Sequence, residues 1–286
     1  EIGVRLVGSE MCIRDRYISY TEAMLSQASQ LPHKPAPIQP RSHICLGLIQ
    51  NPPTFPRAPT LPHNLPDSLR YQATLTEDLM TIRAVVFDFG GVLFDWNPQH
   101  LYRKLIADDA ERQHFLDTIC TQAWNTEQDA GRSLAEGTRH LIEQYPQHEL
   151  LIQAYYDRWH EMLRGALPDG VAILEALHKA DMPLFGLTNW SAETFPYARA
   201  NYPFLQHLRD IVVSGELKLI KPDPAIYHAS LDQVRAHLPD IQAREVVFID
   251  DVAGNIEAAE ALGWQGIHHV SAERTAARLR ALGVSF

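Results

Sequence analysis

Short apolar runs alternate with amphipathic stretches over most of the chain from about residue 84 onward. Each run is bounded by Gly, Pro, Asn or Asp, a pattern that predicts buried strands. Amphipathic helices between such strands favour a parallel sheet that is covered on both faces. The predicted strands cover residues 85–87, 183–189, 211–215, 246–251 and 266–270, and the predicted helices cover residues 192–200, 224–237, 253–262 and 272–282.

Residues 98–165 interrupt this alternation, because they contain several helical patterns and no strand-like run. Pro98 suits the first position of a helix, and Ser133 with Glu136 has the spacing of a capping box. Further along, apolar side chains recur at helical spacing. These are Leu151, Tyr155, Trp159 and Met162. The segment is therefore predicted to form a small helical insertion.

The first 79 residues differ in composition from the rest of the chain. Ten of the nineteen prolines fall within residues 32–66, a segment that has no apolar period and no carboxylates, which predicts disorder. Residues 9–16 (SEMCIRDR) resemble the translated adapter of a sequencing library, and such a scar would carry no biology. A genuine proline-rich tail or linker is the alternative. We expect a disordered or artefactual extension over residues 1–79 and a folded protein that starts at Met80.

Together these patterns predict an α/β fold, with a Rossmann-like, doubly wound parallel sheet as its core and a helical cap subdomain inserted into it. The core would comprise residues 80–96 and 168–286, and the cap residues 97–167. No internal repeat is present.

Composition limits the classes of partner. The 286 residues are 45% hydrophobic, which suits a globular protein, and the formal net charge of −10 disfavours nucleic acid and anionic membranes as partners. No apolar stretch approaches the ~20 residues that span a bilayer, and no secretory signal is recognisable. Cys12, Cys45 and Cys120 are too few and too scattered for a disulfide framework or a zinc site, so free thiols are predicted. We expect a cytoplasmic protein that acts on a small molecule; its oligomeric state is not predicted.

Polar side chains stand at the ends of several predicted strands, where open α/β sheets bind ligands. Asp88 follows the first strand, and Asp250 and Asp251 end a later one. Converging carboxylates would repel by about 4 kcal/mol per pair at ~4 Å and an effective dielectric of ~20. A divalent cation would relieve this, and oxygen ligands favour Mg²⁺. Thr188 and Lys221 could hold a phosphoryl group by hydrogen bond and charge, although each alone would be interpreted as a turn residue.

Four segments, in this order, resemble the haloacid dehalogenase superfamily of hydrolases. They are DFGGVLFD with Asp88, GLTNW with Thr188 and Asn189, LIKPDP with Lys221, and FIDDVAGN with Asp250 and Asp251. With a helical cap between the first and second segments, the chain is similar to the phosphatase-like members, including sugar-phosphate phosphatases. The resemblance covers residues 80–286.

The resemblance implies that Asp88 is a nucleophile, which attacks phosphorus and forms an aspartyl-phosphate intermediate. It also implies that Asp88, the Gly90 backbone carbonyl and Asp251 bind Mg²⁺ directly. Asp250 and Asn255 would lie nearby, either as ligands or behind the ligands. For Asp250, and less so for Asp251, a helix-capping role is the competing interpretation.

By the same resemblance, Thr188 and Lys221 hold the phosphoryl group during transfer. Asn189 and Trp190 would line the substrate pocket, although Trp190 could equally be a packing residue.

The chain departs from the superfamily pattern at one position. Many phosphatases of this kind carry a second aspartate, their general acid and base, where this chain has Gly90. Such assistance typically contributes ~10² to 10⁴-fold to the rate. Either the leaving group is good, as in anomeric sugar phosphates or aryl phosphates, or Asp95 or a cap residue replaces the missing acid. In the cap, Trp124 and Asp129 are candidates for substrate selection or for core packing.

Three functions follow from these residues. The first is a Mg²⁺-dependent phosphatase that hydrolyses a small phosphorylated metabolite. The second is a metal-independent 2-haloacid dehalogenase, since halide leaves without a proton and those enzymes also lack the second aspartate. The third is a catalytically silent phosphate-binding module. The adjacent Asp250 and Asp251 favour the phosphatase, because cation charge offsets the repulsion of phosphate.

Overall fold

The computed structural model describes residues 81–286 of the chain. The predictions for residues 1–79, for a start at Met80 and for Cys12 and Cys45 lie outside the described residues. Cys120 is buried and forms no disulfide, as predicted. None of the helices within residues 81–286 combines the length and the hydropathy that crossing a bilayer requires.

Five parallel strands form the central sheet, in the order β5-β4-β1-β6-β7. The first strand of the chain lies in the middle of the sheet, with Val86 between Phe185 of one neighbour and Phe248 of the other. The strands are β1 (Ala84–Phe87), β4 (Leu184–Thr188), β5 (Ile211–Val213), β6 (Val246–Asp250) and β7 (Gln265–His268).

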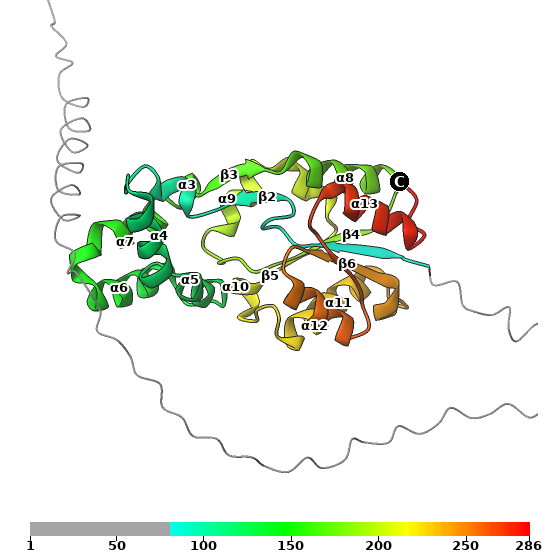
Figure 1. Cartoon of the computed structure of the whole chain (residues 1–286). Coiled ribbons are helices and arrows are strands. Elements are labelled where there is room, and N and C mark those ends of the chain that lie inside the picture. The colour runs from blue at the N-terminus through cyan, green and yellow to red at the C-terminus, as the bar shows by residue number, and fades with distance from the viewer. Residues whose placement is uncertain (1–80) are drawn as a thin grey trace, which may run out of the picture. The chain divides into compact units, whose positions relative to one another are not determined.

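The sheet is buried on both faces because alternate side chains of each strand enter different apolar clusters. Val85 and Phe87 of β1 pack with apolar side chains of α8 and α13. Ala84 and Val86 pack with side chains of α11 and α12 instead. Figure 1 shows these two helix pairs on opposite sides of the sheet, which confirms the predicted doubly wound fold. The helices are α8 (Pro168–Lys179), α11 (Pro224–His237), α12 (Ala253–Ala261) and α13 (Ala272–Ala281), with α9 (Phe195–Asn201) and α10 (Ser214–Leu217) following β4 and β5.

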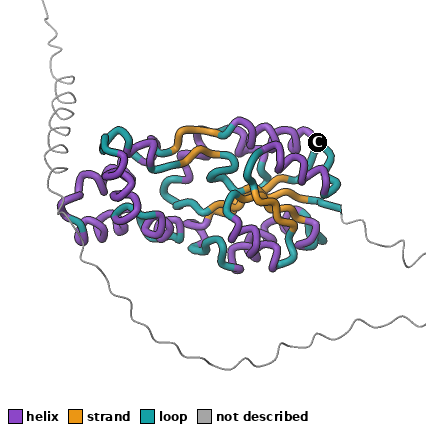
Figure 2. Tube along the Cα trace, viewed as in Figure 1, coloured by secondary structure: helices purple, strands orange, loops and turns teal. Residues whose placement is uncertain are grey.

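The helical insertion follows the first motif, as the sequence predicted. It lies beyond the carboxyl ends of the sheet strands and joins the core through a two-stranded antiparallel ribbon, β2 (Phe94–Trp96) and β3 (Leu163–Ala166) (Figures 1 and 2). The boundaries of core and cap at residues 97 and 167 stay a prediction. The helices of the insertion are α3 (Gln99–Tyr102), α4 (Asp109–Thr118), α5 (Gln122–Asp129), α6 (Leu134–Gln144) and α7 (Glu149–Asp157).

Two features of the insertion differ from the sequence prediction. The helix that contains Leu151 and Tyr155 ends at Asp157, so Trp159 lies in a 3₁₀ turn and Met162 lies beyond it. The chain then forms β3, in a segment where no strand was predicted. The backbone N–H of Asn97 donates to Met162 O at 2.9 Å, and the N–H of Leu167 donates to Leu93 O at 2.8 Å. Pairing with β2 thus overrides the local helical pattern.

Helix termini agree with the sequence where a capping residue marks them. Asp223 caps α11 by accepting a hydrogen bond from Ala225 N at 2.8 Å, and Ser133 caps α6 by accepting one from Glu136 N at 3.2 Å. Helix α9 begins at Phe195, later than predicted, and it has no side-chain cap. Helices α8 and α10 were not among the predicted elements.

Candidate active site

A tight turn after β1 places Asp88 at the carboxyl edge of the sheet. The Asp88 N–H donates to Ile249 O of β6 at 2.8 Å, which continues the ladder between the two strands. Phe89 O then accepts from the N–H groups of Leu93 and Phe94, each at 2.8 Å. Gly91 has a φ of +67°, and a Cβ on it would lie 2.2 Å from Asp251 Oδ2, so only glycine fits there without displacing that carboxylate.

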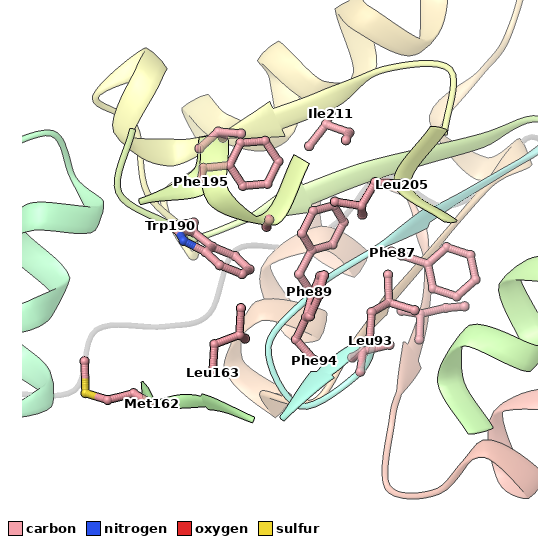
Figure 3. Packing of buried hydrophobic residues seen from close by; sticks show 14 of the residues in the cluster. Phe87, Phe89, Leu93, Phe94, Met162, Leu163, Trp190, Phe195, Leu205 and Ile211 are labelled. Atoms are coloured by element: carbon pink, nitrogen blue, oxygen red, sulfur yellow. The ribbon is translucent and has the colours of Figure 1, made fainter. Parts of the chain in front are cut away.

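An aromatic cluster packs against this turn (Figure 3). The Phe89 ring stacks on Phe195 with centroids 6.0 Å apart, and the Trp190 ring meets the edge of Phe94 at 5.6 Å. The Trp190 indole N–H donates to Thr194 Oγ1 at 3.0 Å. These contacts fix the turn after β1 against the loop after β4, so Trp190 has a packing role as well as a place beside the site.

Three carboxylates meet at the adjoining ends of β1 and β6. Asp88, Asp250 and Asp251 each offer a carboxylate oxygen within 4.8 Å of the other two. Asp250 is fully buried and accepts hydrogen bonds from Val252 N at 2.8 Å and from Asn255 Nδ2 at 3.0 and 3.1 Å. Asp251 is exposed. Asp250 is therefore held rigidly, while Asp251 faces solvent.

Lys221 joins two of these carboxylates. Its buried Nζ lies 2.8 Å from Asp88 Oδ1 and 2.7 Å from Asp250 Oδ2, and it also donates to Leu187 O at 3.2 Å. The Asn189 side chain holds the Lys221 backbone, since Nδ2 donates to the carbonyl at 3.0 Å and Oδ1 accepts from the N–H at 2.9 Å. Lys221 is thus fixed in position at both its backbone and its ammonium group.

The charges in this cluster do not balance. Burial raises the pKa of Asp88; the Lys221 ammonium opposes this shift and the Asp250 carboxylate adds to it. Burial lowers the pKa of Lys221, but the charges of Asp88 and Asp250 outweigh it, so the pKa is raised and the ammonium persists. Burial and then Asp250 raise the pKa of Asp251. The cluster contains three carboxylates and one ammonium group. The excess negative charge and the oxygen ligands of the carboxylates fit a hard divalent cation such as Mg²⁺.

A cavity of about 310 Å³ opens above the acidic cluster, between the core and the insertion. Its floor comes from the ends of the sheet strands and the following loops, and its walls include helices α5 and α7. The lining includes Asp88, Gly90, Asp251, Lys221, Asn189 and Trp190 from the core, and Asn125, Asp129, Tyr156 and Trp159 from the insertion.

A family model for haloacid dehalogenase-like hydrolases matches residues 82–263, which include the acidic cluster, Lys221 and the insertion. The chain belongs to this family. The family and the enzyme class predicted from the sequence, a hydrolase, are thereby confirmed.

Two curated relatives and one solved structure show how this haloacid dehalogenase-like chain compares with characterised proteins. A sesquiterpene phosphatase of Aspergillus oryzae is 28% identical over 71% of this chain and 97% of its own length. An (S)-2-haloacid dehalogenase of a Pseudomonas species is 28% identical over 65% of this chain and 83% of its own. A HAD family enzyme of Bacteroides thetaiotaomicron, solved as a magnesium complex, is 19% identical, covers 65% of this chain and 92% of its own, and has a TM-score of 0.50.

Most of the residues that the sequence singled out as this hydrolase's site meet at one place. Asp88, Gly90, Asp251, Lys221, Asn189, Trp190 and Asp129 line the cavity, and Asp250 lies directly behind the lining. Thr188 ends β4 and is buried, and it is not among the lining residues. Trp124 belongs to the core of the insertion, where its indole N–H donates to Gly137 O at 3.2 Å.

Several lining residues were missed by the sequence analysis. Asn125 lies four residues before Asp129 on the same helix and so shares its face, a spacing that could have indicated a polar pair. Tyr156 and Trp159 carry no comparable signal. Their side chains line the cavity only because α7 and the turn after it pack against α5 and the loop after β4.

Proposed function

We propose that this chain is a Mg²⁺-dependent phosphatase that hydrolyses a small phosphomonoester through an aspartyl-phosphate at Asp88. One observation carries the proposal. Carboxylate oxygens of Asp88, Asp250 and Asp251 gather within 4.8 Å of one another, Lys221 Nζ bridges Asp88 and Asp250, and the group lies at the floor of a cavity. Such a combination of nucleophile, ammonium and cation-binding oxygens suits an anionic substrate.

The acidic cluster would hold the metal ion. Asp88, Asp251 and the Gly90 backbone carbonyl are the proposed direct ligands, and Asp250 is the third carboxylate of the cluster. When bound, Mg²⁺ would supply positive charge that offsets the repulsion between the phosphate and the carboxylates. The magnesium complex of the Bacteroides thetaiotaomicron enzyme agrees with this proposal.

The chain's own residues divide the remaining work. Asp88 is the nucleophile, and its oxygen forms the new bond to phosphorus. Lys221 places an ammonium 2.8 Å from that carboxylate and so can bind a phosphate oxygen at the same point. We also assign phosphoryl binding to Thr188, on the support of its position at the carboxyl end of β4, next to β1 in the sheet. Asn189 positions Lys221 through its two backbone hydrogen bonds.

The cavity indicates the kind of leaving group. Trp96, Trp159 and Trp190 provide flat apolar surface, while Asn125 and Thr126 provide hydrogen-bonding groups. A sugar ring or a hydrocarbon with a polar substituent would match this lining. The candidate substrates therefore include the expected sugar phosphates and the sesquiterpene class named for the Aspergillus oryzae relative. The volume of about 310 Å³ favours a small metabolite over a macromolecule.

A second candidate function is 2-haloacid dehalogenation. It is favoured by Gly90, which leaves the first motif without a second carboxylate, and by the Pseudomonas relative. The clustering of Asp251 with Asp88 and Asp250 favours phosphoryl transfer instead, because Lys221 alone offsets only part of the negative charge that a metal-independent reaction would leave there.

A substrate screen with a metal control tests the proposal. The purified chain would be assayed against phosphorylated metabolites and 2-haloacids, with EDTA and with added Mg²⁺. We expect phosphate release that EDTA abolishes and Mg²⁺ restores. Asp88→Asn should lower the rate of phosphate release by roughly 10³-fold or more. Halide release without Mg²⁺ would establish the dehalogenase in its place. Binding of inorganic phosphate without turnover of any phosphate ester would establish the silent module.

A further inference from the structure

We propose that Asp129, at the end of α5 in the helical insertion, is the general acid and base of the reaction. This inference rests on the proposed phosphatase function. In this proposal a residue of the insertion transfers the proton, in place of a second aspartate at position 90 of the core.

The titratable groups of the cavity leave few candidates for this role. Among residues 81–286, those that line the cavity are Asp88, Asp129, Tyr156, Lys221 and Asp251. Asp88 and Lys221 are ion-paired with each other, and Asp251 belongs to the acidic cluster. Burial raises the pKa of Tyr156 far above its usual range, so its hydroxyl stays protonated near neutral pH and is a poor proton donor. Asp129 is the carboxyl group that remains.

Asp95, the other candidate from the sequence, is occupied elsewhere. Its Oδ1 lies 2.8 Å from His100 Nε2, and Arg164 approaches Oδ2 at 4.0 Å. Asp95 stands in the β2–β3 ribbon and is not among the residues that line the cavity. Its carboxylate therefore has partners of its own and lies outside the lining of the cavity that contains Asp88.

The Asp129 carboxyl group is held from both sides of the cavity. Asn125 Nδ2 donates to Asp129 Oδ2 at 2.8 Å, and the backbone N–H of Ser191, in the loop after β4, donates to the carboxylate as well. The Asp129 backbone carbonyl accepts from Ser214 Oγ at 2.5 Å, which fixes the end of α5 to the core. The carboxyl group thus has a defined position in the wall of the same cavity whose floor contains Asp88.

The surroundings of Asp129 suit a group that both gives and takes a proton. Burial raises the pKa of Asp129 to about 7, because its effect is larger than that of the two hydrogen bonds, which lower the pKa. The neutral acid is therefore available up to about pH 7 and is lost as the pH rises further. The ionisable groups on the elements around Asp129 include Tyr155 and Tyr156 of α7, Arg132 after α5, Glu193 after β4, Glu216 of α10 and Lys218 after α10. Glu193, Glu216 and Lys218 are exposed, Arg132 pairs with Glu127, and burial keeps Tyr155 and Tyr156 protonated.

Protons and bonds balance over the two steps. In the first step, an Asp88 oxygen bonds to phosphorus, the bond from phosphorus to the leaving oxygen breaks, and the Asp129 proton moves to that oxygen to give the free alcohol. In the second step, a water oxygen bonds to phosphorus while the Asp129 carboxylate takes a proton from the water. The bond between Asp88 and phosphorus breaks, inorganic phosphate leaves, and both carboxyl groups regain their starting states.

Two substrates with different leaving groups test the assignment. 4-Nitrophenyl phosphate expels a stable phenolate, whereas a simple alkyl phosphate needs a proton on its leaving oxygen. For Asp129→Asn we expect kcat/KM for the alkyl phosphate to fall by ~10² to 10⁴-fold, while kcat/KM for the aryl phosphate changes little. The retained aryl activity shows that the variant is folded. Asp117→Asn, which removes an exposed carboxylate from helix α4 of the insertion, should leave both values unchanged.

The pH dependence provides a second measurement. In the wild type, kcat/KM for the alkyl phosphate should fall as the pH rises through about 7, and this fall should be missing in Asp129→Asn. Position 90 offers a rescue, since nothing lies within 4 Å of a Cβ built on Gly90. Gly90→Asp in the Asp129→Asn background should therefore return alkyl phosphate turnover toward the wild-type value.

The outcomes separate this inference from the function on which it rests. Equal losses for the aryl and alkyl phosphates in Asp129→Asn would overturn the acid–base role, because they would indicate a structural or binding contribution. Failure of the wild type to hydrolyse either phosphate in the presence of Mg²⁺ would overturn the phosphatase function itself, and the role of Asp129 with it.

Discussion

Gly91 determines how closely the turn after β1 can approach Asp251. Its φ of +67° is in the left-handed region, and a Cβ there would lie 2.2 Å from Asp251 Oδ2 and 2.6 Å from Asp251 Cγ. Asp251 is exposed, so its side chain has room to rotate away. Such a rotation would remove one oxygen from the acidic cluster, which makes metal binding sensitive to a single methyl group.

We therefore predict that Gly91→Ala weakens Mg²⁺ binding by roughly 10- to 100-fold, because it displaces a proposed ligand. The backbone strain adds a loss of roughly 1–2 kcal/mol in the free energy of unfolding. Calorimetric titration with Mg²⁺ and urea unfolding would measure the two effects. Gly254→Ala is the matched control, since nothing lies within 4 Å of a Cβ at that position. Mg²⁺ affinity in Gly91→Ala equal to that of the control would contradict the prediction.

At the level of elements, the contact between α5 and α10 joins the insertion to the core. Ser214 Oγ accepts from Trp190 N at 2.9 Å and donates to Asp129 O at 2.5 Å, so one hydroxyl connects the loop after β4 to the end of α5. Leu134 N, at the start of α6, donates to Glu193 Oε1 at 2.8 Å nearby. The position of the Asp129 carboxyl group thus depends on a short polar contact between elements.

Ser214→Ala should loosen this contact. The substitution leaves a buried N–H and a carbonyl without their partner, which costs about 1–3 kcal/mol in stability. We expect hydrogen–deuterium exchange to accelerate in α5 more than in the central strands. Ser271→Ala removes the distant cap of α13, where Ser271 Oγ accepts from Arg274 N at 3.3 Å, and should leave exchange in α5 unchanged. Equal exchange in α5 for Ser214→Ala and the wild type would exclude this role of Ser214.

The sequence predicted those elements whose conformation is determined locally. Val246–Asp250 was recognisable as a strand because its apolar run is typical of a strand buried on both faces, and all five residues are buried. Helix α11 begins as predicted because Asp223 caps it and Pro224 follows. Leu163–Ala166 could not be recognised, since its sequence, LRGA, has no strand pattern and its conformation comes from pairing with β2. The pairing depends on a contact between two distant segments, and the pattern of residues within one segment does not reveal such a contact.

At the level of the whole molecule, the acidic cluster was predictable and the cavity walls were not. Asp88 follows β1 and Asp250 ends β6, and these strands are neighbours, so their parallel pairing necessarily brings the two carboxylates together. Asp129 reaches the same cavity only through the packing of α5 on the loop after β4. The residues that would select the substrate and move the proton therefore depend on how the insertion sits on the core.

The proposed phosphatase requires that Asp88 carries the phosphoryl group during turnover, and trapping the phosphoryl group on Asp88 tests this requirement. The enzyme would be mixed with Mg²⁺ and 4-nitrophenyl phosphate, quenched in acid within a turnover, and mapped by peptide mass spectrometry. We expect a phosphoryl group on Asp88 that requires Mg²⁺ and is absent from Asp88→Asn. A phosphoryl group on a different residue, or hydrolysis by Asp88→Asn at the wild-type rate, would contradict this expectation.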